Sequence, residues 1–356
     1  MIALEVSSAA GNIPGGVPGA IRHLVSALTR GDPETRYLLC SRFSRWRKGR
    51  VFRSEAPNAE TRVLQDPFNA FLLRGARLLH SMGIFLPVTP CIPKLLTVHD
   101  LNAVRNVQWV TPRWHERRSG RIEHALARAD HVVTYSAFTA NEIREHYALA
   151  ADRVHPIPLG VDAQRFQPCS AAELEQTRAA HGDFVLSIGL LTPRKNFPSL
   201  IEAIAPLAGL RLVLVGRASD GEAEVRDTID RLGMAERVGW IPSVSHAELV
   251  RLLGAARAYA VPSLYEGFGL TVLEAMACGT PVVCSDAASL PEVAGDAALL
   301  VDARKPEALR HALERVVESK ELAEDLRKRG LERARALSWE RAARELRQLY
   351  RDVGGV

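Results

Sequence analysis

Hydrophobic positions along the chain form two kinds of pattern, and these alternate. Short continuous apolar runs are typical of buried parallel strands. They predict strands at residues 2–6, 94–98, 131–135, 153–159, 184–189, 210–216, 237–240, 256–261, 281–285 and 297–301. Between them apolar residues recur at three- and four-residue spacing, which predicts helices at 21–30, 121–129, 138–148, 197–204 and 246–256. The alternation indicates an α/β fold with parallel sheets covered by helices.

The alternation is interrupted once, and the interruption suggests a domain boundary. The polar stretch "GVDAQRFQPCSAAELEQ" at 160–176 lacks a clear period, and strands resume at 184. The chain has 356 residues, which suits two domains better than one. We predict two doubly wound domains, residues 1–165 and 166–337, followed by a helix at 338–356.

The most informative stretch is "VPSLYEGFGLTVLEAMACGTPVVCSD", residues 261–286. It predicts a strand end, a glycine turn and a helix that closes at Gly279. Free N–H groups at a helix N-terminus favour phosphate, and glycines allow close approach of a ligand. Glu266 and Glu274 are suited to accept hydrogen bonds from sugar hydroxyls. The combination predicts a site for a nucleotide sugar.

Polar residues also follow other predicted strands, at the sheet edge where open α/β sheets bind ligands. Arg194 and Lys195 come shortly after the strand that ends at Gly189, and two such cations suit a diphosphate. His99 and Asp100 directly follow the strand at 94–98. We expect Asp100 to orient its loop or His99, and Ser136 to cap the helix after the strand at 131–135.

The segment "EGFGLTVLEAMACGTPVV" resembles the E-x7-E motif of retaining glycosyltransferases of family 4, and the resemblance extends over essentially the whole chain. It implies the GT-B fold, in which two Rossmann-like domains face each other across a cleft. It further implies that Glu266 contacts the donor hexose and that Glu274 binds the ribose. The backbone between them would hold the sugar and the phosphates, through Gly267, Phe268, Gly269, Leu270 and Thr271.

The same resemblance implies roles for other residues. His99 would lie against the hexose, and Arg194 and Lys195 would stabilise the departing diphosphate. The remaining donor-binding candidates are glycines at strand ends and in the first glycine-rich loop, namely Gly15, Gly16, Gly189 and Gly216. The catalytic candidates are His99, Arg194, Lys195 and Glu266. The terminal helix at 338–356 would cross back onto the N-terminal domain.

The reaction implied by the resemblance transfers a hexose with retention of its anomeric configuration. The favoured course is attack on the face from which the diphosphate leaves, with the diphosphate taking the acceptor's proton. The sequence has no Asp-x-Asp metal motif, so we expect no metal ion and no cofactor; the nucleotide sugar is a substrate.

The donor and the acceptor are less closely defined. "TPRKNFPSL" resembles mannosyltransferases of bacterial surface-polysaccharide assembly, which favours GDP-mannose, with a UDP-hexose as the alternative. The acceptor would be a hydroxyl of a saccharide or a lipid-linked saccharide. Two other interpretations stay open: a nucleotide-sugar epimerase on the same architecture, and a nucleotide-sugar-binding protein without catalysis.

The net charge of +5 is unevenly distributed along the chain. Residues 1–170 hold 22 basic and 14 acidic side chains, a balance of +8, and the remainder hold 24 and 27, a balance of −3. The segment Ser41–Ser54 has six basic residues, no acid and interleaved aromatic residues. It suits peripheral contact with an anionic membrane better than nucleic acid, the alternative being a solvated loop.

Three further features bear on location. No apolar run is long enough to span a membrane, and the N-terminus lacks the basic region of a signal peptide. The five cysteines are scattered without metal-ligand spacing, which favours reduced thiols. We therefore expect a cytoplasmic protein, with possible attachment to the inner face of the membrane.

Overall fold

The computed structural model describes residues 1–11, 15–89 and 92–355, and the chain divides into two compact units. The first unit comprises residues 1–160 together with 339–356, and the second comprises 161–338. The predicted boundary at 165 lies within the second unit, because Val161 donates its N–H to the Leu337 carbonyl at 3.0 Å and pairs with Ser338.

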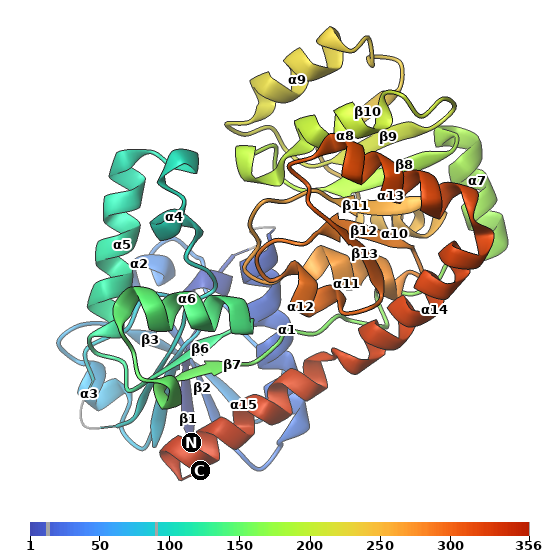
Figure 1. The fold of residues 1–356 in the computed structure, drawn as a ribbon. Coiled ribbons are helices and arrows are strands. Elements are labelled where there is room, and N and C mark those ends of the chain that lie inside the picture. The colour runs from blue at the N-terminus through green and yellow to red at the C-terminus, as the bar shows by residue number, and fades with distance from the viewer. Residues whose placement is uncertain (12–14, 90–91, 356) are drawn as a thin grey trace. The chain divides into compact units, whose positions relative to one another are not determined.

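The first unit is built on a seven-stranded sheet in the order β3-β2-β1-β4-β5-β6-β7, and every described pair is parallel (Figure 1). Its strands are β1 (Ile2–Glu5), β2 (Tyr37–Arg42), β3 (Ala59–Leu64), β4 (Leu78–Ser81), β5 (Lys94–Thr97), β6 (His131–Thr134) and β7 (Val154–Pro156). Its helices are η1 (Ser7–Ala9), α1 (Gly16–Gly31), α2 (Phe43–Trp46), α3 (Asn69–Leu72), α4 (Asn102–Arg105), η2 (Val107–Trp109), α5 (Pro112–Leu126), α6 (Ala137–Tyr147), η3 (Ala151–Arg153) and α15 (Trp339–Gly354).

The C-terminal helix α15 packs on α1 within the first unit. Trp339 stacks on His23 with ring centroids 5.2 Å apart. The Tyr350 hydroxyl lies 2.6 Å from Nδ1 of buried His80, whose Nε2 lies 2.8 Å from the Thr97 hydroxyl. A buried polar chain thus joins the last helix to β4 and β5.

The second unit is built on a six-stranded parallel sheet in the order β10-β9-β8-β11-β12-β13. Its strands are β8 (Phe184–Ile188), β9 (Arg211–Val215), β10 (Val238–Ile241), β11 (Ala258–Val261), β12 (Val282–Ser285) and β13 (Ala298–Val301). Its helices are α7 (Ala171–His181), η4 (Pro193–Lys195), α8 (Phe197–Ile204), α9 (Glu222–Arg231), α10 (His246–Ala255), α11 (Leu270–Ala277), α12 (Leu290–Ala294), α13 (Pro306–Glu318) and α14 (Lys320–Ala336).

Both units are therefore Rossmann-like, which confirms the predicted fold class. One core cluster of the second unit joins α8 and α13 to the strands through fully buried residues such as Ile201, Leu212 and Leu313. In each sheet the first strand of the unit is central, so the chain winds outward in both directions and leaves the strand ends on one edge accessible to loops.

Part of the predicted connector is helical. Ser170 and Glu173 form a capping box, in which the Ser170 hydroxyl accepts from the Glu173 N–H and the Glu173 carboxylate accepts from the Ser170 N–H. This fixes the start of α7 at Ala171, inside the stretch interpreted as a linker. The strands β2, β3 and β4 were also not predicted; β3 is a half-exposed edge strand with a weak apolar pattern.

Candidate active site

The turn between β11 and α11 has the predicted strand–glycine–helix form. Gly269 has a left-handed backbone with φ 103°, and a Cβ added there would lie 2.9 Å from Leu290 Cδ2. The position therefore needs glycine both for its conformation and for space. Helix α11 begins at Leu270 and ends with Gly279 in the left-handed region, φ 76°, as the sequence indicated.

Glu266 lies between the two predicted cations. Lys195 Nζ donates to Glu266 Oε1 at 2.6 Å, and Arg194 Nη1 donates to Glu266 Oε2 at 3.1 Å. The Arg194 Nη1 group also donates to the Tyr265 carbonyl at 2.9 Å. The side chain of Lys195 is 11% exposed and that of Glu266 is 13% exposed. The loops after β8 and β11 are thus held together by a largely buried ion cluster.

This cluster sets the protonation state of Glu266. Burial by itself would raise the carboxyl pKa, but the charges of Lys195 and Arg194 outweigh burial and lower the pKa to about 2. Glu266 is consequently a carboxylate at neutral pH and can only accept hydrogen bonds. The sequence predicts that the cations bind a phosphate and the acid a sugar; in the structure the three side chains also pair with one another.

Ser289 supports the same loop and was not predicted. Its hydroxyl lies 2.8 Å from the Glu266 carbonyl and 3.0 Å from the Phe268 carbonyl. Ser289 occupies the N-cap position of α12 but makes no capping bond to that helix. In the sequence, a serine directly before "LPEV" has the pattern of an ordinary helix N-cap. Only the folded chain shows that Ser289 supports the loop of Glu266.

Glu274 has a different environment on α11. It is half-buried, and its side chain makes no hydrogen bond or ion pair within the part of the chain that the structure describes. Burial raises the pKa of its carboxyl to about 7, against the opposing charge of Arg165. A carboxylate there can take a ligand donor without first breaking an internal bond.

Two predicted glycines pack against each other. A Cβ added to Gly216 would lie 1.7 Å from the Gly189 carbonyl oxygen, and one added to Gly189 would lie 2.8 Å from Lys195 Cε. The backbone contact already requires glycine at Gly216, and a side chain at Gly189 would displace Lys195. These contacts do not test whether Gly189 and Gly216 touch the donor, so that role stays a prediction.

The candidate residues of the first unit lie at the carboxyl end of β5 and at the start of α1. His99 is 7% exposed, packs against Tyr135 with ring centroids 5.3 Å apart, and has a pKa lowered to about 4 by burial and by Arg118. The imidazole is therefore neutral at neutral pH. Gly15 is the N-cap of α1 and Gly16 its first residue; residues 12–14 of that predicted loop lie outside the described residues.

Two supporting residues behave as predicted. Asp100 accepts from the Asn102 N–H at 3.0 Å and so shapes the loop after His99. The Ser136 hydroxyl accepts from the Thr139 N–H at 3.1 Å and caps α6. Among the described residues no group of three or more His, Cys, Asp and Glu side chains could hold a metal ion.

Comparison with known proteins identifies the family. Residues 14–165 match the family model described as Glycosyltransferase Family 4, and residues 173–333 match that of Glycosyl transferases group 1. The O-antigen chain mannosyltransferase B of Escherichia coli is 30% identical over 309 residues, covering 82% of this chain and 78% of that protein. The chain belongs to the group 1 glycosyltransferases of family 4.

Other similar proteins agree on the family and on the fold. The D-inositol 3-phosphate glycosyltransferase of Saccharomonospora viridis is 33% identical over 280 residues, 74% of this glycosyltransferase and 65% of that protein. The structure of a sucrose-phosphate synthase from Thermosynechococcus elongatus superposes with a TM-score of 0.81, at 26% identity over 99% of this chain and 98% of that one. The glycosyltransferase WaaG superposes at 0.70, with 16% identity and full coverage of both chains.

Two features of the basic segment in the first unit differ from the sequence expectations. The segment Ser41–Ser54 begins in β2 and α2, and Ser41 is fully buried. Of its aromatic residues, Trp46 is 52% exposed, whereas Phe43 and Phe52 are half-buried.

Cys40, Cys169, Cys278 and Cys284 are free thiols, as expected, and Cys91 lies outside the described residues. No described helix is long and apolar enough to cross a membrane.

Proposed function

We propose that this glycosyltransferase moves a hexose, with retention, from a nucleoside diphosphate to a hydroxyl of a saccharide or a lipid-linked saccharide. The observation that carries the proposal is the ion cluster of Arg194, Lys195 and Glu266 at the carboxyl ends of β8 and β11. In this cluster two cations and one ionised carboxylate lie in the loops beside the N-terminus of α11. Those are the groups that a diphosphate and a sugar hydroxyl require.

The state of Glu266 supports the same-face course over a covalent intermediate. A carboxylate whose pKa is about 2, with both oxygens bonded to cations, is a poor nucleophile. When a diphosphate approaches, the same cations can turn from Glu266 toward its oxygens. They then stabilise the negative charge that develops on the diphosphate as its bond to the sugar breaks. In this proposal Arg194 and Lys195 do the work of a divalent metal, and no cofactor takes part.

We propose mannose from GDP-mannose as the donor, because the E. coli protein that is 30% identical is named as a mannosyltransferase. The test is a panel of GDP- and UDP-hexoses in which the release of nucleoside diphosphate is measured with a saccharide acceptor. Release only from UDP-hexoses would contradict the donor assignment, and no release or transfer with any donor would contradict the function. Epimerised nucleotide sugar would point to the epimerase.

The anomeric configuration of the product, determined by NMR, tests retention. Activity should persist in EDTA, and its loss there would contradict metal independence. Arg194→Ala and Lys195→Ala should lower turnover by about 100-fold at saturating donor, since their charges matter most in the transition state. Variants with full turnover and only a raised KM would contradict this role.

For the acceptor, we propose that the surface around α2 contacts anionic lipid. Trp46 is exposed among four exposed or half-buried basic residues, Arg45, Arg47, Lys48 and Arg50. Each such cation near an anionic bilayer contributes about 1 kcal/mol. Sedimentation with anionic liposomes should fall in high salt and in Trp46→Ala, while Trp114→Ala, at a similarly exposed tryptophan of α5, serves as the control. Equal sedimentation of both variants would contradict the contact.

A further inference from the structure

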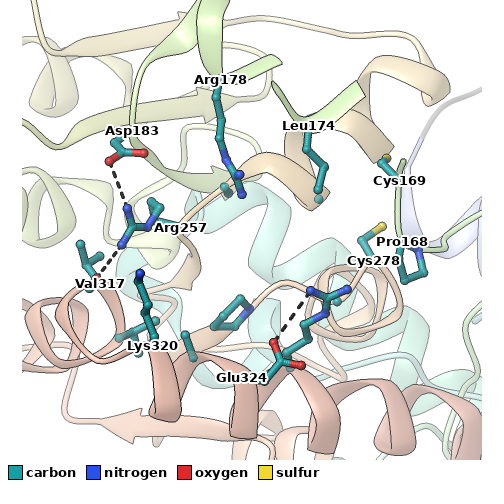
Figure 2. Close-up of a pocket in the computed structure, with 17 residues that line it drawn as sticks. Pro168, Cys169, Leu174, Arg178, Asp183, Arg257, Cys278, Val317, Lys320 and Glu324 are labelled. Atoms are coloured by element: carbon teal, nitrogen blue, oxygen red, sulfur yellow. Dashed lines mark hydrogen bonds and ion pairs between the residues drawn. The ribbon is translucent and has the colours of Figure 1, made fainter. Parts of the chain in front are cut away.

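The second unit contains a separate cavity of about 510 Å³, which lies among α7, α13, α14 and the turns before β8, β11 and β12 (Figure 2). Its volume falls within the range of pockets that hold small molecules. All lining residues belong to the second unit, so the cavity is complete within that unit.

This cavity is distinct from the candidate active site. Asp183, Arg257 and Pro281 line it, and they directly precede β8, β11 and β12. They therefore mark the amino ends of the strands. The ion cluster of Arg194, Lys195 and Glu266 follows the carboxyl ends of β8 and β11. The two sites lie at opposite edges of one parallel sheet.

The charges of the cavity do not balance. Four basic side chains line it, Arg178, Arg257, Lys320 and Arg327, against the two acids Asp183 and Glu324. Arg257 pairs with Asp183 at 3.1 Å, and the guanidinium of Arg327 lies 3.9 Å from Glu324. Within the described part of the chain, no acidic side chain pairs with Arg178 or with Lys320. Two positive charges are left over.

Backbone contacts hold the guanidinium groups in place. Arg178 Nε donates to the Ala255 carbonyl at 3.1 Å, and Arg257 Nη2 donates to the Val317 carbonyl at 2.6 Å. Arg178 extends from α7 into the cavity, and the ammonium of Lys320 points toward Arg257 (Figure 2). Because Asp183 already offsets the charge of Arg257, the two charges that an anion in the cavity could balance are those of Arg178 and Lys320. The free N–H groups of Arg178 remain available to such an anion.

The floor of the cavity is apolar. It is formed by Leu174, Cys278, Pro281 and Val316, and burial raises the pKa of the Cys278 thiol to about 12, so that the thiol is neutral. A cationic rim over an apolar floor suits a ligand with an anionic end and an organic body. An inorganic ion would leave the floor unused.

We propose that this cavity binds the phosphate monoester of a small organic molecule, of the size of a sugar phosphate. Such a monoester carries a charge close to −2 at neutral pH, which matches the two unpaired cations, and its oxygens suit the planar N–H groups of arginine. The assignment does not depend on the identity of the donor or the acceptor of the transferase reaction.

The experiment is a calorimetric titration of the full chain with ribose 5-phosphate, with inorganic phosphate and with ribose. Ribose 5-phosphate should bind at one site, inorganic phosphate more weakly, and ribose not measurably. Lys320→Ala and Arg178→Ala should each weaken binding about tenfold or more, because each removes a charge-assisted contact. Lys328→Ala, at an exposed lysine of the same helix outside the cavity, is the matched control and should bind as the wild type does.

Thermal melting of each variant confirms that it is folded, and the Lys320→Ala result stands even if Arg178→Ala unfolds. Binding should persist in the double variant Arg194→Ala, Lys195→Ala, which separates this cavity from the candidate active site. Absence of binding at millimolar ribose 5-phosphate would overturn the proposal. So would binding that is lost with Arg194 and Lys195, or equal affinity for inorganic phosphate.

Discussion

The two units place ionisable groups at the carboxyl edges of their sheets in opposite states. In the second unit, Glu266 is bonded to two cations and has a pKa of about 2. In the first unit, Glu5 at the end of β1 is 1% exposed, and burial raises its pKa to about 7, although the Arg42 side chain lies 3.9 Å away. Two buried carboxyls thus differ because one has close cationic partners and the other has only a distant one.

This difference agrees with what each unit is expected to bind. In the second unit Glu266 stays ionised between Arg194 and Lys195 at neutral pH, as a site for a diphosphate and a sugar hydroxyl would require. In the first unit His99 is uncharged and Glu5 is about half protonated near pH 7. Uncharged groups suit the hydroxyls of a neutral sugar or acceptor.

The largest effect is expected when the terminal helix α15 is removed, because it belongs to the first unit and packs on α1. Trp339, Leu346, Leu349 and Tyr350 are buried, and their burial contributes roughly 6–10 kcal/mol, comparable to the stability of a whole domain. A chain that ends before Ser338 should therefore lose the unfolding transition of the first unit in calorimetry and keep that of the second.

Two single variants refine this prediction. Tyr350→Phe should cost about 1–3 kcal/mol, because it leaves His80 Nδ1 buried without its partner. Gln348→Ala, on the exposed face of α15, should melt as the wild type does. A truncated chain with an unchanged melting profile would show that α15 does not support the first unit.

The next effect concerns the ion cluster. Glu266→Gln should lower turnover by about 100-fold and the free energy of unfolding by about 3 kcal/mol, because it leaves two cations without a partner. The folded pKa lies below the unfolded value of 4.5, so this stabilisation is present above pH 4.5 and is lost as the pH falls toward 2. Chemical denaturation across this range measures it.

A double variant separates charge balance from catalysis. Lys195→Met combined with Glu266→Gln should regain part of the stability without regaining activity, since one cation and the carboxylate are removed together and only Arg194 stays charged. Recovery of turnover in the double variant would show that neither side chain acts on the substrate.

Glu5 should show the opposite pH dependence. Between pH 4.5 and about 7 the unfolded chain has released the Glu5 proton and the folded chain retains it, so stability falls as the pH rises. Glu5→Gln should remove this slope and raise the free energy of unfolding by up to about 3 kcal/mol above pH 7. Glu34→Gln, at an exposed site, is the control. Equal pH profiles for wild type and Glu5→Gln would contradict the comparison.

The smallest effect is expected at Glu274. Glu274→Ala should weaken binding of the bare nucleoside diphosphate by roughly 1.5–3 kcal/mol, the value of a charge-assisted hydrogen bond. Because the pKa is raised to about 7, wild-type affinity should increase as the pH rises through neutrality, and the variant should lack that increase. Calorimetry at several pH values tests both; unchanged affinity in the variant would give Glu274 a structural role.

Local patterns in the sequence were sufficient for much of the fold. The strand–glycine–helix form of residues 261–279, the Ser136 cap and the alternation of strands and helices depend on neighbours within a few residues, so the sequence determines them directly. The capping box of Ser170 and Glu173 is of the same kind, and it was legible in "SAAE" although the segment was interpreted as a connector.

Only the tertiary structure decided which of these groups meet. Glu266 pairs with cations that stand 71 and 72 positions earlier, Gly216 packs on Gly189 from the neighbouring strand, and Tyr350 reaches His80 across 270 positions. The sequence by itself determined that an acid and two cations follow strand ends. The strand order, which sets β8 beside β11, determined that they neutralise one another, because electrostatic interaction depends on distance in space and not along the chain.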